Sequence, residues 1–171
     1  MATVKLRSRN GGRKKLTTEQ VRHVKDFTAW ALDRLLGNRL SERIGIDVVM
    51  DSTLFAKQGV YGTAIWEDTH RRSREFTLEV DTSAKFSTVM NTIAHELVHV
   101  KQWASGEYYA IDTGAYVYRY RGATHDTRVT DYWELPWEVE AYGRSIGLLV
   151  MWIRAAGLEG AEWTKQEITL A

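Results

Sequence analysis

His95-Glu96-Leu97-Val98-His99 places two imidazoles four residues apart, with a carboxylate next to the first. On an α-helix, residues four positions apart lie one above the other on the same face, so both histidines can reach one small cation. Glu96 lies about 100° around the helix from His95, beside a metal without being forced to bind it. Two histidine ligands with such a carboxylate are typical of a zinc hydrolase, in which the carboxylate takes a proton from water.

The same segment could also be a solvated helix face, since this pattern arises by chance in roughly one chain in a hundred. Apolar residues at helical spacing argue against that reading, because they predict a helix that is buried on one side. These residues are Met90, Ile93, Ala94, Leu97 and Val100. We expect the helix to be capped by Thr82 or Ser83, to run to about Ala104, and to turn its histidines toward a cleft.

The composition limits the kinds of chemical site and the cellular compartment that we expect for this chain. Its 171 residues indicate one domain with a substantial core. The absence of cysteine excludes thiolate zinc sites, disulfides and cysteine nucleophiles. No apolar signal segment opens the sequence, and the longest apolar run, residues 148–153, is too short to span a bilayer. We therefore expect a cytoplasmic protein without membrane contact.

The first 15 residues carry a local excess of positive charge. They hold six basic side chains and no acidic one: Lys5, Arg7, Arg9, Arg13, Lys14 and Lys15. Removing these six from the 23 basic residues leaves 17 against 22 acidic ones, a net charge of −5 for the remainder. With Gly11-Gly12 inside it, this stretch predicts a flexible basic arm over residues 1–16. Such arms are more often solvated tails, but weak nucleic-acid contact through phosphates is an alternative.

The rest of the chain, residues 17–171, reads as one domain in which helices alternate with short strands. A capping box of Thr17 and Gln20 opens a helix over residues 17–37, and Pro136 begins the last helix. Alternating apolar residues predict strands at 44–50, 60–66 and 75–80, with a polar loop at 67–74. A hairpin is expected from residues 115–120 and 127–130.

That hairpin region is rich in groups that could stabilise an oxyanion beside the active helix. They are Tyr116, Tyr118, Tyr120, Tyr132 and His125. Most of them are expected to be packing residues, and the sequence does not choose among them.

A site with two histidines needs a third protein ligand, and the start of the last helix offers two glutamates. Glu138 and Glu140 lie about 200° apart around a helix, so only one of them can face the metal well. Both could instead be acids that the helix dipole favours near an N-terminus. We expect one of the two to be the ligand.

With its E-x-E-A segment at residues 138–141, the chain resembles the gluzincin metallopeptidases, and among them short metallopeptidase-like proteins of tailed bacteriophages. The resemblance implies that Glu138 is the ligand, although Tyr142 stands where the family has an aspartate, which keeps Glu140 open. SprT-like zincins, which are more loosely similar, use a third histidine, and His125 is the candidate for that role. The family's fold would be a minimal zincin-like α+β domain.

In that fold, a small, mostly antiparallel sheet of three to five strands packs on the N-terminal helix, the H-E-x-x-H helix and the glutamate-bearing helix. The expected activity is zinc-dependent peptide hydrolysis, with Zn²⁺ on His95, His99 and Glu138 and with Glu96 as general base. The strand at 75–80 resembles the zincin edge strand that pairs with a peptide or protein substrate. A phage protein of this kind would act in the host cytoplasm.

Two alternatives belong to other functional classes. One is a catalytically silent zincin-like protein that binds a partner or forms part of a virion. The other is a nucleic-acid-binding protein that uses the basic arm and has a structural metal site.

Overall fold

The computed structural model describes residues 1–68, 71–111 and 116–167 of the chain. The α-helices are α1 (Thr18–Leu36), α2 (Asn38–Ser41), α3 (Leu54–Gln58), α4 (Phe86–Ser105) and α5 (Pro136–Ala155). The strands are β1 (Thr3–Arg9), β2 (Gly45–Asp51), β3 (Gly62–Trp66), β4 (Glu75–Asp81), β5 (Tyr108–Ala110), β6 (Val117–Tyr120) and β7 (Ala123–Asp126). Three 3₁₀ helices complete the described elements: η1 (Gly12–Lys15), η2 (Tyr132–Glu134) and η3 (Glu162–Lys165). The α+β class is confirmed.

The main sheet is mixed, with strand order β1-β2-β4-β3. β2 pairs in parallel with both β1 and β4, because α1 and then α3 with β3 lie in the connections between these strands. β3 and β4 follow one another in the chain and pair antiparallel. The expectation of a mostly antiparallel sheet therefore holds for the small β5-β6-β7 sheet but not for the main one. The edge strand beside α4 is β3, not the strand at residues 75–80.

The prediction of a flexible arm at residues 1–16 is wrong, because Thr3–Arg9 forms β1 and Gly12–Lys15 forms η1. Val4 and Leu6 pack against the core, and the basic residues alternate with them. The Arg9 guanidinium lies 2.6 Å from the Asp51 carboxylate and 2.8 Å from that of Glu79. The positive charges are thus partly the outer face of a strand, where carboxylates of neighbouring strands compensate them.

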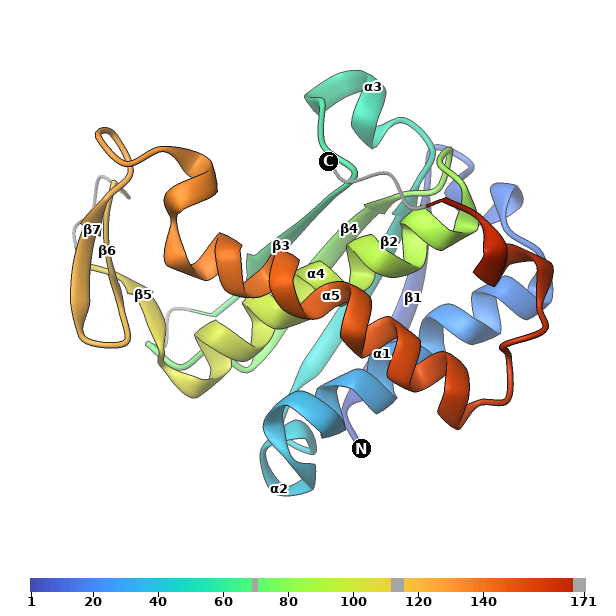
Figure 1. The fold of residues 1–171 in the computed structure, drawn as a ribbon, viewed down its shortest axis with the longest axis horizontal. Helices are drawn as coiled ribbons and strands as arrows, with labels where there is room; N and C mark the ends of the chain where they lie inside the picture. Colours follow the sequence, from blue (N-terminus) through green and yellow to red (C-terminus); the bar gives the residue numbers. More distant parts are fainter. Residues whose placement is uncertain (69–70, 112–115, 168–171) are drawn as a thin grey trace.

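One face of the main sheet is covered by helices. α1 packs on β1 and α4 on β3 and β4, and α5 packs across α4 (Figure 1). The core between these layers is formed by alternate residues of β2 and β4 and by the apolar face of α4. From the strands it takes Ile46, Val48, Met50, Phe76, Leu78 and Val80, and from α4 it takes Met90, Ile93, Ala94, Leu97 and Val100. The predicted apolar stripe of the H-E-x-x-H helix is confirmed.

The helix starts differ in how well the sequence predicts them. The capping box of α1 is present, since the Thr17 side chain accepts from the Gln20 backbone N–H at 3.1 Å and the Gln20 side chain accepts from Thr17 at 2.9 Å. α4 instead begins after Lys85 without a side-chain cap. Thr82 and Ser83, the predicted caps, lie before this position: the Thr82 hydroxyl donates to the Gly12 carbonyl and the Ser83 hydroxyl to Asp81, and neither caps α4.

The hairpin β6–β7 turns at Arg121-Gly122, where both residues have positive φ. Its second strand is Ala123–Asp126 rather than residues 127–130, because a two-residue turn brings the chain straight back. The expected first residue of this hairpin, Ala115, lies outside the described residues. The β5-β6-β7 sheet lies beside the end of α4 and near the start of α5 (Figure 1). In the described parts of the chain, no helix combines the length and apolarity needed to cross a membrane.

Candidate metal centre

Three side chains from two helices converge at the centre of the molecule. His95 and His99 lie one turn apart on α4, and Glu138 lies in the first turn of α5. The two histidine Nε2 atoms are 3.1 Å apart, and each lies 3.4 Å from Glu138 Oε2. All three side chains are largely buried, Glu138 being 8% exposed.

These distances fit a metal ion. In a tetrahedral site with bonds of about 2.0–2.1 Å, neighbouring ligand atoms are about 3.3 Å apart. The observed separations of 3.1–3.4 Å agree with that edge length. Among the described residues, this is the one group of three histidine, aspartate or glutamate side chains that meets the geometric requirement for a metal. The group of His95, His99 and Glu138 can therefore hold a metal ion.

The electrostatics of the group favour a charged Glu138. Burial alone would raise the pKa of Glu138, but hydrogen bonds with His95 and His99 hold it well below its usual range. Burial alone would lower the pKa of His99, but its contact with Glu138 and the charge of Glu96 raise it to about 9. Without a metal, a proton on the histidines balances the Glu138 carboxylate; a bound cation would take over that role, because a ligating imidazole must be neutral.

Neither alternative third ligand takes part in this group. Glu140 contacts a later part of α4, where Lys101 and Gln102 donate to it at 3.2 and 3.0 Å. His125 lies on β7 and packs edge-on against the ring of Trp137, with ring centroids 5.6 Å apart. The geometry therefore selects Glu138 over both.

Glu96 lies between α4 and the edge strand β3. It is 7% exposed, and the backbone N–H of Ala64 donates a hydrogen bond to its carboxylate. Burial raises the pKa of Glu96, which the two neighbouring histidines partly oppose. A buried carboxylate with a raised pKa, beside a metal group but outside it, is suited to taking up a proton.

The close approach of β3 to α4 depends on Gly62, which the sequence reading missed. A Cβ at this position would lie 2.4 Å from Thr92 Cγ2 and 3.2 Å from Glu96 Oε1. A larger residue would push against both side chains, so Gly62 favours the short distance between the edge strand and Glu96. The available signal was a glycine within a predicted strand, which often marks a close backbone approach.

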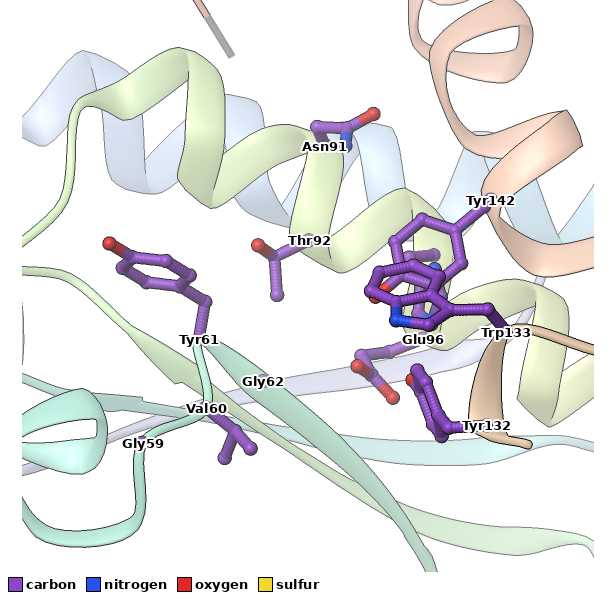
Figure 2. Close-up of a pocket in the computed structure, with 11 residues that line it drawn as sticks. Gly59, Val60, Tyr61, Gly62, Asn91, Thr92, Glu96, Tyr132, Trp133 and Tyr142 are labelled. Atoms are coloured by element: carbon purple, nitrogen blue, oxygen red, sulfur yellow. The ribbon is translucent and has the colours of Figure 1, made fainter. Parts of the chain in front are cut away.

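Two cavities flank Glu96. One, of about 290 Å³, is lined by β3 and its preceding loop on one side and by Trp133 and Tyr142 on the other (Figure 2). Figure 2 shows the Glu96 carboxylate pointing toward the space between Gly62 and Tyr132. The other, of about 220 Å³, contains His99 and Glu138 and is walled by aromatic side chains of β3, α4 and α5. The metal group and Glu96 therefore open onto a cleft along β3.

Of the five tyrosine and histidine candidates for an oxyanion donor, Tyr132 is the one that reaches the site. Its hydroxyl donates to Glu138 Oε2 at 2.9 Å, and its side chain borders both cavities. Tyr120 donates to Glu140 instead, and Tyr118 stacks on Tyr108. Tyr116 is 52% exposed and lies under Arg128.

Tyr142, four residues after Glu138 on α5, makes an aromatic contact with the metal group. Its ring packs edge-on against that of His95, with centroids 4.4 Å apart. The ring thereby limits how far the His95 imidazole can rotate away from Glu138.

Comparisons of the chain with protein-family models, with curated proteins and with solved structures found no match. The interpretation of the site therefore rests on its own geometry and chemistry.

Proposed function

We propose that the protein is a zinc-dependent metallopeptidase that hydrolyses peptide bonds with Glu96 as general base. The observation that carries this proposal is the joint geometry of the site. Three ligand atoms lie at the edge lengths of a tetrahedral metal site. A buried carboxylate that is not one of the ligands lies beside them and faces an open cleft.

Two nitrogen donors and one carboxylate oxygen form the ligand set of many catalytic zinc sites, which keep a fourth position open. When bound there, Zn²⁺ would polarise a substrate carbonyl and make a bound water more acidic. The chain's own contribution is to hold the ligands and to move the proton. Glu96 would take it at a carboxylate oxygen and pass it to the leaving amine.

The edge strand supports a peptide substrate. β3 is hydrogen-bonded to β4 on one side and borders the cleft on the other. An extended peptide that pairs with this edge would run past Glu96 and the metal group. The Tyr132 hydroxyl borders both cavities and donates to Glu138 Oε2; it would turn to the developing oxyanion when that oxygen binds the metal.

The test compares zinc-loaded wild type with Glu96→Gln on a mixture of fluorogenic peptides and on an unfolded protein. We expect hydrolysis by the wild type and a loss of about 10²–10⁴-fold in Glu96→Gln, with zinc retained in both. Equal hydrolysis by the two proteins would contradict the proposal. A zinc-loaded wild type that cleaves none of the substrates would point instead to a catalytically silent binding protein.

A further inference from the structure

The two histidines of the metal group differ in what their second ring nitrogen contacts. Nδ1 of His99 lies 2.9 Å from Oε1 of Gln102, one turn further along α4. Nδ1 of His95 is buried and finds no hydrogen-bond partner within the described residues. Within the described residues, a side-chain hydrogen bond therefore holds Nδ1 of His99 but not Nδ1 of His95.

The orientation of the Gln102 amide follows from its other contacts. Its Nε2 donates to the Trp137 carbonyl and to Glu140 Oε2, both at 3.0 Å. If the amide were flipped, its oxygen would face both of these acceptors, and its NH₂ group would face His99. Gln102 is fully buried, so water cannot relieve those contacts. The amide oxygen must therefore face His99.

This orientation determines the tautomer of His99. An amide oxygen only accepts hydrogen bonds, so Nδ1 of His99 must carry a hydrogen. In the neutral imidazole, the lone pair then belongs to Nε2, which is the atom that faces Glu138 and His95. The hydrogen bond also holds the plane of the ring.

Glu140 is the anchor of this arrangement. Five donors from α4, α5 and the β6–β7 hairpin surround its carboxylate: Lys101, Gln102, Tyr120, Arg121 and Arg144. Because these donors come from three different elements, the Glu140 carboxylate is fixed in place and holds one N–H of Gln102.

We propose that Gln102 is a positioning residue that presents Nε2 of His99 to the metal, and that Glu140 holds Gln102 in that role. This inference rests on the proposed metal centre. It gives the second glutamate of the E-x-E-A segment a function: Glu138 is a ligand, while Glu140 acts on a ligand through Gln102. Outer hydrogen bonds of this kind typically change metal affinity by about 10–100-fold.

The first test measures the zinc affinity of wild type, Gln102→Met and Lys101→Met by competition with a chromophoric chelator. Methionine keeps the size of glutamine but cannot accept from His99. Lys101 is the matched control, because it is the adjacent buried residue on α4 and also donates to Glu140, yet it does not contact His99. We expect the affinity to fall at least about tenfold in Gln102→Met and to stay within about twofold in Lys101→Met.

The second measurement uses wild type alone, so it does not depend on whether Gln102→Met folds. Nitrogen-15 NMR of the zinc-loaded protein should show His99 protonated at Nδ1 and metal-bound at Nε2. A His99 that binds zinc through Nδ1, or equal affinities of wild type and Gln102→Met, would overturn the role of Gln102 but leave the metal centre standing. A wild type that binds no zinc would overturn the metal centre and this inference together.

Discussion

Replacing Gly62 with alanine tests how closely the edge strand must approach the catalytic helix. The added Cβ would lie 2.4 Å from Thr92 Cγ2, whereas carbon atoms in contact are normally about 3.5 Å apart. Because the Thr92 side chain is β-branched and stiff on a helix, we expect β3 and α4 to move apart by about 1 Å to relieve this overlap. The same movement changes the position of Glu96, since the new atom also lies 3.2 Å from its Oε1.

Two magnitudes follow from this movement. Overpacking of a buried contact typically costs about 1–3 kcal/mol, so the free energy of unfolding of Gly62→Ala should fall by that amount. A catalytic group displaced by about 1 Å can lose about 100-fold in rate, so kcat/KM for peptide hydrolysis should fall to about one hundredth of the wild-type value. Zinc content should not change, because no ligand lies in the overlap.

The assays are urea unfolding of the metal-free protein, zinc analysis and peptide hydrolysis. Gly143→Ala is the matched control, because a Cβ at this exposed position of α5 meets no atom within 4 Å. It should stabilise the protein by about 0.4–1 kcal/mol and leave hydrolysis unchanged. A Gly62→Ala variant as stable and as active as Gly143→Ala would refute the inferred approach of β3 to Glu96.

Three further predictions concern β1, Tyr132 and the basic residues of η1. Arg9→Met should lower the free energy of unfolding by about 2 kcal/mol, because it leaves the buried Asp51 carboxylate without its charge partner. The partial exposure of Arg9 keeps this loss below that of a fully buried pair. Burial alone would raise the pKa of Asp51, but Arg9 holds it well below its usual range. The stability that this pair contributes is therefore complete above about pH 4 and is lost as the pH falls further. In urea titrations, the free energies of unfolding of wild type and Arg9→Met should converge as the pH is lowered below that value. Tyr132→Phe also removes a hydrogen bond to Glu138, so it is assayed at saturating zinc. There it should lose about 10²-fold in kcat with little change in KM, and unchanged kcat would exclude Tyr132 as oxyanion donor. If the wild type binds duplex DNA, Lys14→Glu with Lys15→Glu should reduce the slope of log affinity against log salt by about two, and an unchanged slope would place the contact elsewhere.

Local patterns predicted the elements that carry the site. The apolar stripe of α4, the Thr17–Gln20 box and Pro136 at the start of α5 each depend on residues within one or two turns, and all three appear as expected. The separation of Glu138 and Glu140 around a helix likewise predicted that only one could face the metal. The angle alone did not say which; the packing of α5 on α4 selects Glu138.

The errors concern partners that are distant in the sequence. Counting the charge of residues 1–16 without Asp51 and Glu79 predicts an arm, whereas these two carboxylates compensate Arg9 from 42 and 70 positions away. Strand order depends on pairing across the sheet, which no local pattern reports, so the sequence does not identify the edge strand. The contacts of Gln102 are equally non-local, since two of its three side-chain partners lie on α5.

The central claim is that His95, His99 and Glu138 hold a zinc ion, and elemental analysis tests it most directly. The proteins to compare are wild type, Glu138→Gln and Glu140→Gln, each reconstituted with zinc and freed of excess. The account predicts about one zinc per chain in wild type and in Glu140→Gln, and little in Glu138→Gln. A wild type without zinc, or zinc lost from Glu140→Gln but kept by Glu138→Gln, would contradict it.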